Sequence, residues 1–271
     1  MAFRRRTKSK NMTLPDFGPE FPFYVAAIVS AFLVGLSKGG LPAIGSLGVP
    51  VLALVISPIR AAGLLLPIYV ASDVVGLWVY RREYDVRILK IVVPAAILGV
   101  GFGWATASWM SEALVTLIVG VIGLAFCLIR AFPRRVDPAP REPDVPRGVF
   151  WGAITGFVSF VSHSGAPPYQ MYVIPLNQPK MLFAGTSTIA FAIINWVKLV
   201  PYYALGQFSP ANLREASFLI PVAIVGTFMS AVATRLIPDR VFFRIITLAL
   251  FLVSLKLSWD GIRGLLPFFV S

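Results

Sequence analysis

FPFYVAAIVSAFLVGLSKGGLPAIGSLGVPVLALVIS, residues 21–57, is an apolar run interrupted by glycine and proline. Its first part, residues 21–36, is short for a membrane-spanning helix, which needs about 20 residues. The part that follows, residues 39–57, is too interrupted for an ordinary helix. Lipid offers no hydrogen bonds, so such backbone lies at membrane depth only where protein buries it or where it lines a cavity. We therefore expect this stretch to contribute to a functional site inside a membrane protein.

The composition is that of a membrane protein. Apolar residues make up 57% of the 271 residues and charged residues 13%, which is about half of the charged share in soluble proteins. Much of the surface must therefore face lipid, and we count the lipid bilayer among the partners. The net charge of +12 comes from 24 Lys and Arg that separate long apolar runs. They do not form a basic groove with interleaved aromatic residues, so we expect no nucleic acid partner.

About eight apolar stretches approach the length of a membrane-spanning helix. We therefore predict an all-α polytopic membrane protein with about eight transmembrane helices. The fifth stretch is short like the first, and it too is followed by a broken segment that is rich in Gly and Pro, residues 164–177. The eight stretches are residues 21–36, 60–80, 88–107, 112–132, 149–160, 180–205, 212–236 and 241–257.

The chain divides into two halves that resemble each other. Matching residues recur in the same order before and after a segment rich in Pro and Arg, which predicts two homologous four-span repeats. In each repeat, a re-entrant Gly/Pro-rich segment breaks the region of the first helix. Paired broken segments indicate a secondary transporter whose substrate binds where the repeats meet. The matching residues are Ser37, Gly40, Pro42, Asp73 and Tyr80 in the first half and Ser162, Gly165, Pro167, Asn195 and Tyr202 in the second.

The order of segments predicts an orientation in the membrane. We divide the chain into a basic tail at residues 1–20, a first transmembrane repeat at 21–132, a Pro/Arg-rich linker at 133–147 and a second transmembrane repeat at 148–271. A polar stretch separates the basic residues of the tail from the first apolar run, unlike in a signal peptide, so we expect the tail to be retained. Counting eight crossings from a cytoplasmic tail places most basic residues, including the linker, in the cytoplasm. We therefore expect a multi-pass protein of the cell membrane, the inner membrane in bacteria. The charge count favours parallel repeats, and inverted repeats stay open because a crossing in either broken segment would reverse everything downstream.

Both broken segments are rich in residues that can bind an anion. In each segment, glycine precedes a proline that suits the start of a half-helix, at Pro42 and at Pro167. The start of such a helix offers free amide groups and a partial positive charge, and nearby serine hydroxyls add further donors. The candidate substrate-binding residues in the two segments are Ser37, Lys38, Gly39 and Gly40, and Ser162, His163, Ser164 and Gly165.

Lys198 and Asn195 extend this set from an otherwise apolar span, where they share one helix face. A lysine within a span usually faces a cavity or a partner, although Lys198 could also snorkel to the interface, and Lys38 could belong to an interfacial loop. Asp73 lies deep within another span, as a counter-ion to Lys198, a proton-coupling group or a packing element. His163 is either a proton-coupling group or a hydrogen-bonded structural histidine.

The chain lacks the patterns of an enzyme. It has one His and one Cys, His163 and Cys127, which lie far apart in the sequence and give no metal-ligand pair. It also has no nucleophile elbow and no P-loop. We therefore predict no catalytic activity, no metal and no cofactor.

The chain contains the motifs Gly35-Leu-Ser-Lys-Gly-Gly with Pro50, Gly185-Thr-Ser, and Asn195-Trp-Val-Lys-Leu-Val-Pro-Tyr-Tyr-Ala-Leu-Gly206. These three motifs resemble the TauE/SafE family of membrane transporters, which are described as sulfite or organosulfonate exporters. The similarity extends from about residue 21 to about residue 261. One segment departs from the family, because many members have a glycine-rich run in each half, whereas the second run here is Ser162-His-Ser-Gly-Ala-Pro-Pro-Tyr.

The resemblance implies transport, in the outward direction, of sulfite or organosulfonates. The residues alone lead to an anion-preferring cavity at the repeat interface that opens to each side of the membrane in turn, with a small anion as partner. Three alternatives stay open: another small anion, transport in the uptake direction, and a non-transporting membrane assembly or interaction protein whose broken segments only pack. Homo-oligomerisation stays open as well.

Overall fold

The computed structural model of the protein describes residues 20–107, 109, 111–131 and 141–270. Every regular element in these ranges is helical, as predicted. Nearly all of the predicted tail and most of the predicted linker lie outside the described residues. The division of the chain into tail, repeats and linker therefore stays a prediction.

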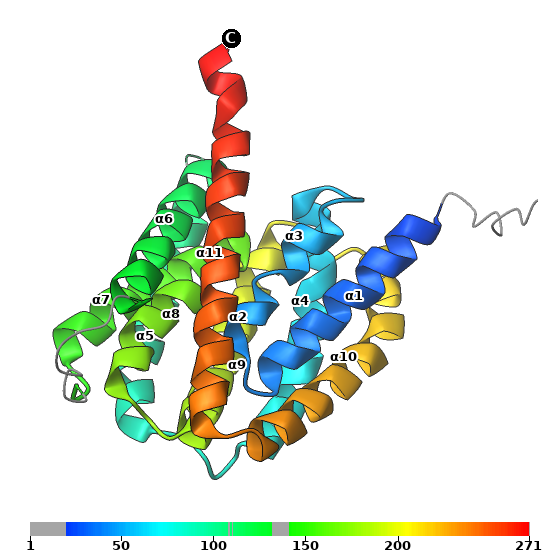
Figure 1. Cartoon of the computed structure of the whole chain (residues 1–271). Helices are drawn as coiled ribbons and strands as arrows, with labels where there is room; N and C mark the ends of the chain where they lie inside the picture. Colours follow the sequence, from blue (N-terminus) through cyan, green and yellow to red (C-terminus); the bar gives the residue numbers. More distant parts are fainter. Residues whose placement is uncertain (1–19, 108, 110, 132–140, 271) are drawn as a thin grey trace, which may run out of the picture.

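The two halves of the chain contain the same order of elements. Each has one long helix, a short interrupted stretch and three further long helices (Figure 1). The first half holds α1 (Phe21–Lys38), α2 (Pro42–Gly45), α3 (Gly48–Leu52), α4 (Pro58–Val79), α5 (Val86–Thr106) and α6 (Glu112–Ala131). The second half holds α7 (Val145–Ser162), α8 (Ala166–Val173), the 3-10 helix η1 (Ile174–Leu176), α9 (Lys180–Ala204), α10 (Pro210–Leu236) and α11 (Asp239–Val270).

Polar residues fix where several long helices start. Ser57 precedes α4 and its side chain accepts a hydrogen bond from the amide of Arg60, and Ser209 does the same for Asn212 at the start of α10. Asp85 accepts from two amides in the first turn of α5. Such caps satisfy amide groups that have no partner within the helix, so these residues define the connections between the helices.

Six helices in the described part are long and apolar enough to cross a membrane. They are Phe21–Lys38, Pro58–Val79, Val86–Thr106, Lys180–Ala204, Asn212–Leu236 and Asp239–Leu266. The fourth and fifth predicted spans also form helices, α6 and α7. The apolar part of α6, Glu112–Leu128, is shorter than the six, and α7 is not among them. The membrane-protein class is thus supported, and the number of eight spans stays a prediction.

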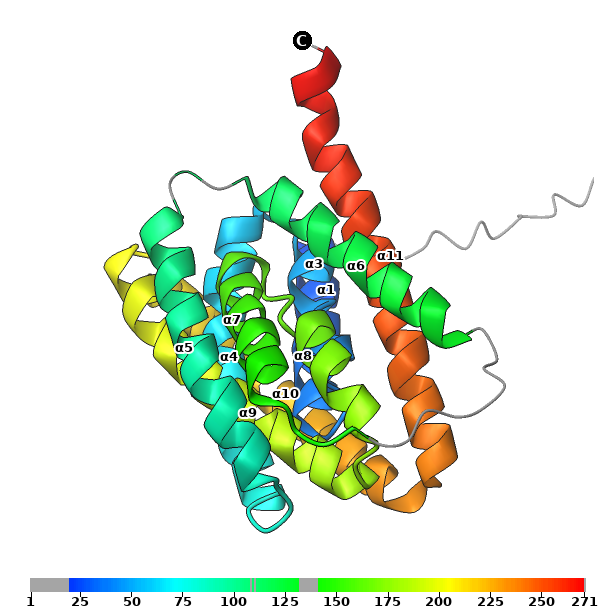
Figure 2. The same ribbon diagram turned by 90° about the vertical axis from the view of Figure 1, so that its left-hand side faces the viewer.

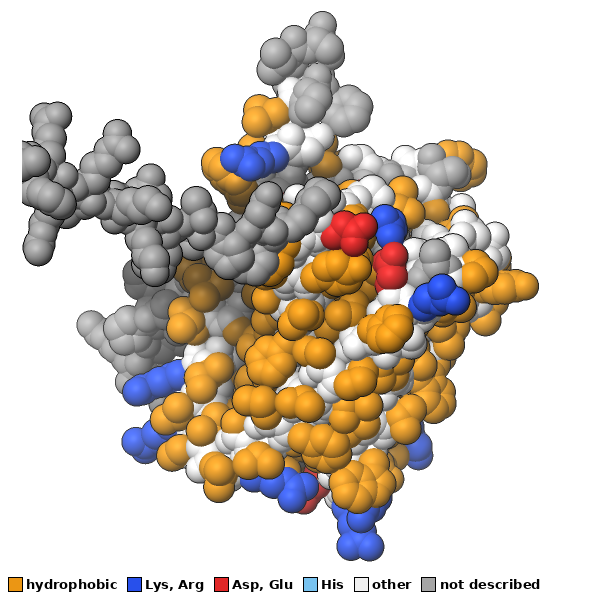
Figure 3. All heavy atoms as spheres, turned by 90° about the vertical axis from the view of Figure 1, so that its right-hand side faces the viewer, with side chains coloured by type: hydrophobic (Ala, Val, Ile, Leu, Met, Phe, Trp, Pro, Cys, Tyr) orange, Lys and Arg blue, Asp and Glu red, His pale blue; other side chains and the backbone are white. Residues whose placement is uncertain are grey.

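The surface agrees with a lipid environment. Large apolar side chains are exposed along the outer sides of the long helices, including Leu98 at 74%, Phe218 at 76% and Val200 at 64%. Figure 3 shows apolar side chains covering the middle of one face, with most Lys and Arg side chains at its lower end. A belt of this kind has no counterpart on ordinary soluble proteins, and lipid tails would cover it.

Corresponding helices of the two halves pack against each other in opposite directions. Asp73 of α4 contacts Asn195 of α9, and farther along α4 Gly76 packs on Thr188. Residue numbers therefore rise along α4 as they fall along α9. The pair α6 and α11 behaves in the same way, since Gly120 packs on Ser258 and Gly264 packs on Ala113. By contrast, α1 runs parallel to α10 and α5 runs parallel to α7 (Figures 1 and 2).

Small residues allow these helices to approach closely. A Cβ atom added to Gly156 of α7 would lie 1.9 Å from the carbonyl oxygen of Ala96 on α5. One added to Gly35 of α1 would lie 2.0 Å from the carbonyl oxygen of Ala223 on α10. Only glycine permits backbone contact of this kind between neighbouring helices.

The chain reverses direction after α1 and again after α7. A Cβ atom on Gly45 would lie 2.8 Å from the Cβ atom of Ser37, so α2 returns along α1. The turn passes through Gly40, whose φ of 122° is open to glycine but costly for other residues. In the second half, α7 ends at His163 in the left-handed region with φ 55°, and α8 then returns beside Ser159.

The bundle has two ends, which we name by what lies there. The linker end holds the α4–α5 loop, the start of α7, η1 and the α10–α11 turn, which are joined by contacts such as that of the Arg141 amide with the Pro175 carbonyl. The opposite end, the vestibule end, holds the starts of α1, α4, α6 and α10. There Arg60 of α4 pairs with Glu215 of α10.

Candidate functional site

A small polar cavity lies in the middle of the bundle, between the two halves. Its volume is about 30 Å³, enough for one or two water molecules. We call it the central cavity. It is lined by Ser37, Lys38, Pro42, Gly45, Ser46, Tyr69, Ser159, His163, Ala166, Thr188, Phe191, Asn195 and Lys198.

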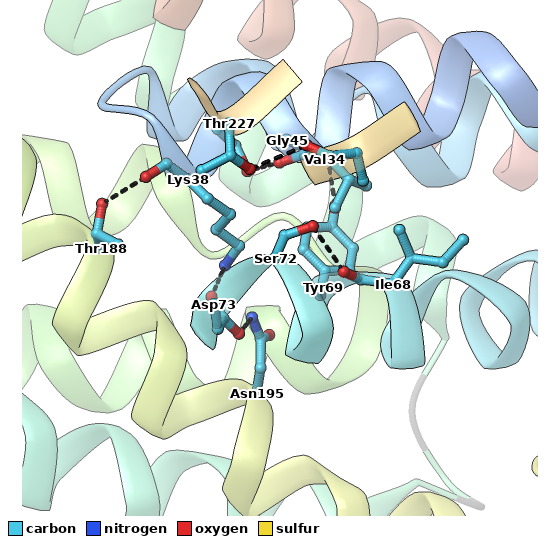
Figure 4. A network of polar contacts seen from close by, with 12 residues as sticks. Val34, Lys38, Gly45, Ile68, Tyr69, Ser72, Asp73, Thr188, Asn195 and Thr227 are labelled. Atoms are coloured by element: carbon cyan, nitrogen blue, oxygen red, sulfur yellow. Dashed lines mark hydrogen bonds and ion pairs between the residues drawn. The ribbon is translucent and has the colours of Figure 1, made fainter. Parts of the chain in front are cut away.

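Lys38 and Asp73 form an ion pair beside this cavity. The Lys38 Nζ atom lies 2.6 Å from Asp73 Oδ1, and the two side chains are 4% and 0% exposed. The other carboxylate oxygen of Asp73 accepts a hydrogen bond of 2.9 Å from the Asn195 amide (Figure 4). Lys38 also lies over the ring of Tyr69, 5.1 Å from its centroid. The opposite charge therefore offsets part of the desolvation cost of burying each side chain, which an isolated charge would bear in full.

Lys198 has a different set of partners. Its Nζ atom lies 3.1 Å from the carbonyl oxygen and 3.2 Å from the hydroxyl of Ser159, and 3.2 Å from Nδ1 of His163. An ammonium group has three N–H donors and no acceptor, and these three atoms match it. In this arrangement His163 is neutral, with its proton on Nε2, which donates to the Tyr202 hydroxyl at 2.7 Å. The Tyr202 hydroxyl in turn donates to the carbonyl of Phe160 at 3.2 Å.

The reversals of the chain bring these side chains to the centre. Lys38 is the last residue of α1, and the Thr188 hydroxyl on α9 holds its carbonyl at 3.2 Å (Figure 4). His163 follows the last residue of α7, and its ring stacks on Tyr69 of α4 with centroids 5.6 Å apart. The two corresponding ends of the broken helices therefore face the same cavity from opposite halves.

Five of the predicted site residues line the central cavity. They are Ser37, Lys38, His163, Asn195 and Lys198. Asp73 lies directly behind them, fully buried, and contacts the site through Lys38 and Asn195. Lys38 and Lys198 are 3% and 1% exposed, so Lys198 does not snorkel to the interface and Lys38 is not on an interfacial loop.

The other predicted site residues lie away from the cavity lining. Gly39 packs against α10, and Gly40 forms the turn near the linker end. Gly165 packs against the backbone of α7 at Thr155, so its role is close approach of the chain. Ser162 and Ser164 face cavities at the vestibule end of the bundle.

The structure corrects two expectations about hydrogen-bond donors. The three predicted hydroxyl donors give their protons to backbone carbonyls: Ser37 to Val34, Ser162 to Val158 and Ser164 to Ser162. The half-helix starts are also poor donors, because α2 is a single turn of four residues and α8 has prolines at its second and third positions. Proline has no N–H group, so the start of α8 offers few free amides to an anion.

A further difference concerns the partner of Asp73. Among the alternatives from sequence was a counter-ion role toward Lys198, but the carboxylate of Asp73 pairs with Lys38. The helix positions explain this difference. Lys38 ends α1 beside Gly76, one turn from Asp73, while Lys198 lies on the face of α9 that turns toward Ser159 and His163.

A larger cavity, the vestibule, lies next to the central cavity toward the vestibule end. Its volume is about 220 Å³. His163 lines both cavities and is the residue that they share. The vestibule is lined by Val49, Pro58, Ile59, Ala62, Ala107, Glu112, Phe160, Val161, Ser162, His163, Tyr202, Leu205 and Gln207.

Several cavity residues were not predicted from the sequence. Tyr69 and Phe191 flank the Lys38 ammonium from α4 and α9, with centroid distances of 5.1 and 5.9 Å. They occupy corresponding positions in the two halves, at the spacing that relates Asp73 to Asn195, so the repeat itself carried a signal for them. Ser159 carried no such signal, because a serine within an apolar helix is common and only the fold brings it to Lys198.

The chemistry of the site favours an anion. Two buried lysines and one carboxylate surround a polar cavity, and the described residues contain no cluster of His, Cys, Asp and Glu that could hold a metal ion. Buried cationic donors of this kind bind anions through short charge-assisted hydrogen bonds.

Comparison with known proteins agrees with this picture. The family model described as sulfite exporter TauE/SafE matches residues 27–257. The chain belongs to this family. Membership of the TauE/SafE family makes the protein a membrane transporter of sulfur-containing anions and supports the resemblance drawn from the motifs. Searches of curated proteins and of solved structures gave no match.

Proposed function

We propose that this TauE/SafE protein is a secondary transporter that moves sulfite or organosulfonates by alternating access around the central cavity. The observation that carries the proposal is the pair of buried lysines, Lys38 and Lys198, at a cavity between the two halves. A buried ammonium group is costly in a membrane, and a transported anion gives it a partner. At about 30 Å³ the cavity is too small for a sulfonate, so substrate entry requires the halves to move.

The helix directions favour two inverted repeats. The eight predicted spans correspond to α1, α4–α7 and α9–α11, with α1 and α7 as the first arms of re-entrant hairpins. If α4–α6 and α9–α11 all cross the membrane, the antiparallel pairs α4/α9 and α6/α11 relate the halves by a two-fold axis in the membrane plane. This arrangement replaces the parallel repeats that the charge count favoured, because each hairpin returns to the side from which it came.

The positive-inside rule then favours a cytoplasmic linker end. The return of the chain after α1 puts the start of α1 at the opposite end, so this orientation reverses the cytoplasmic N-terminus that we expected from sequence. The basic tail argues for the other choice, and it lies outside the described residues. The described basic residues at the linker end are Arg81, Arg82, Arg87, Lys90, Arg141, Arg147, Lys180, Arg235, Arg240 and Arg244, and those at the vestibule end are Arg60, Arg214, Lys256 and Arg263.

Two tyrosines at corresponding positions close the two routes to the cavity. Toward the vestibule end, the Tyr202 hydroxyl holds His163 between the vestibule and the central cavity. Toward the linker end, the Tyr80 hydroxyl donates to the Gly39 carbonyl at 2.5 Å, and Thr234 donates to the same oxygen at 3.0 Å. We propose that these contacts open alternately during transport.

Energetics favour export. One negative charge that leaves a cell with an inside-negative potential of about 100 mV gains about 2.3 kcal/mol. This supports an outward gradient of roughly fifty-fold without a coupled ion. Proton coupling through Asp73 or His163 is therefore unnecessary for export, and it would be needed for accumulation by uptake.

Anion flux in proteoliposomes tests the proposal. Lys198→Gln removes the cation while keeping a polar side chain, and we expect it to abolish sulfite and sulfonate flux. Lys90→Gln is the matched control, because Lys90 is exposed on α5 away from the cavity, and its flux should equal that of the wild type. Wild-type vesicles without flux above empty vesicles would favour a non-transporting assembly protein.

A further inference from the structure

The buried charges of the central site do not sum to zero. Among the described residues, the buried acidic and basic side chains are Lys38, Lys198, Asp73 and His163. The neutral tautomer of His163 follows from its contact with Lys198, since a protonated Nδ1 would point a donor at an ammonium group. With both lysines protonated, two cations and one anion leave one positive charge.

The contacts of the two lysines show which of them has no carboxylate partner. Lys38 lies 2.6 Å from a carboxylate oxygen of Asp73, and this pair cancels. Lys198 contacts three neutral acceptors, two on Ser159 and one on His163. Hydrogen bonds to neutral groups orient an ammonium ion but do not neutralise it, so the site keeps an uncompensated charge in a region of low dielectric constant.

We propose that the site selects anions with a single negative charge, such as monosulfonates and hydrogensulfite, over doubly charged anions of similar size. This inference rests on the proposed function and specifies the substrate charge of the same site. A monoanion makes the buried cluster neutral, whereas a dianion leaves it with one excess negative charge. Either excess is costly away from water.

The contacts also indicate where the anion binds. All three N–H groups of Lys198 are occupied, so an anion that reaches Lys198 must replace an acceptor. His163 is the replaceable one, because it lines the vestibule as well as the central cavity. Ser159 offers a backbone carbonyl that α7 holds in place. The monoanion therefore takes the position of His163 Nδ1, within reach of Lys38.

Two ligands of similar size separate charge from shape. Isethionate carries a sulfonate and a neutral hydroxyl, and sulfoacetate carries a sulfonate and a carboxylate. Stabilisation of the detergent-purified protein against heat, measured over a range of concentrations at constant ionic strength, gives a dissociation constant for each. For the wild type we expect isethionate to bind about ten-fold more tightly or better, because the second charge of sulfoacetate lacks a partner.

Two variants test the charge count itself. Asp73→Asn leaves two cations without a carboxylate and should reverse the preference toward sulfoacetate. The double variant Lys38→Gln/Asp73→Asn removes the neutral pair and leaves Lys198 alone, so it should keep the preference for isethionate even with weaker affinity. The double variant also keeps the selection rule testable if Asp73→Asn alone fails to fold.

The possible outcomes distinguish a failure of the selection rule from a failure of the anion site itself. Equal affinities in the wild type, or a wild-type preference for sulfoacetate, would overturn the selection rule and leave an anion transporter. An unchanged preference in Asp73→Asn, or a reversed one in the double variant, would do the same. If neither ligand stabilises the wild type at any concentration, the anion site itself is wrong, and the selection rule falls with it.

Discussion

Replacement of Lys38 by methionine should destabilise the protein strongly. The change removes one partner of an ion pair with a separation of 2.6 Å and side-chain exposures of 4% and 0%. Asp73 then keeps only the Asn195 amide, and its carboxylate is buried without a counter-charge. Breaking such a pair by removing one partner typically costs about 3–5 kcal/mol. For a domain of this size, that corresponds to a fall in melting temperature on the order of 10 °C.

Thermal unfolding in detergent, followed by tryptophan fluorescence, measures this effect. The exposed pair of Arg60 and Glu215, 2.9 Å apart with side chains 46% and 32% exposed, is the matched control. Water screens that pair, so Arg60→Met should cost less than about 1 kcal/mol. The double variant Lys38→Met/Asp73→Asn should recover most of the stability that Lys38→Met loses, because it leaves no buried carboxylate without its cationic partner.

The double-mutant cycle shows whether Lys38 and Asp73 contribute to stability jointly or independently. If the two residues form the ion pair described, the loss in the double variant is much smaller than the sum of the single losses. Additive losses, or a Lys38→Met variant as stable as Arg60→Met, would refute the pairing and with it the charge count of the central site.

Three further predictions concern packing, gating and orientation. Gly156→Leu should disrupt the contact of α7 with α5 and lower the yield of folded protein, measured by size-exclusion chromatography, whereas Gly101→Ala, which meets nothing within 4 Å, should have no effect. Tyr80→Phe should increase labelling of a cysteine placed in the central cavity from the linker end, and Tyr202→Phe should increase it from the vestibule end; equal labelling in both variants would contradict the gates. A reporter enzyme fused to the C-terminus should be active outside the cytoplasm, and activity inside would reverse the proposed orientation.

The amino-acid sequence indicated which residues lie at the central cavity better than it indicated their contacts. A charged side chain in an apolar span must find a partner or a cavity, and this rule pointed to Lys198 and Asp73. Asn195 was found because it shares a helix face with Lys198. Which lysine pairs with Asp73 depends on the rotation of three helices and on where α1 ends. Short-range sequence patterns carry no information on either quantity. The counter-ion role toward Lys198 was one of three alternatives for Asp73, and the observed ion pair is with Lys38.

The path of the chain was the other feature that sequence could not settle. A Gly/Pro-rich stretch can cross the membrane or return, and the difference is set by a few dihedral angles, such as φ 122° at Gly40 and φ 55° at His163. One reversal changes the side of every later loop. The charge count assumed that the chain did not reverse after α1, and it therefore favoured parallel halves.

The position of a bound sulfonate tests the central claim most directly. Bromoethanesulfonate carries one negative charge and a bromine atom that anomalous diffraction can locate in crystals of the protein. Our account predicts that the sulfonate lies in the central cavity within hydrogen-bond distance of the Nζ atoms of Lys38 and Lys198, with the His163 ring displaced. A sulfonate bound only in the vestibule, or bound at the cavity with the Lys198–His163 contact intact, would contradict it.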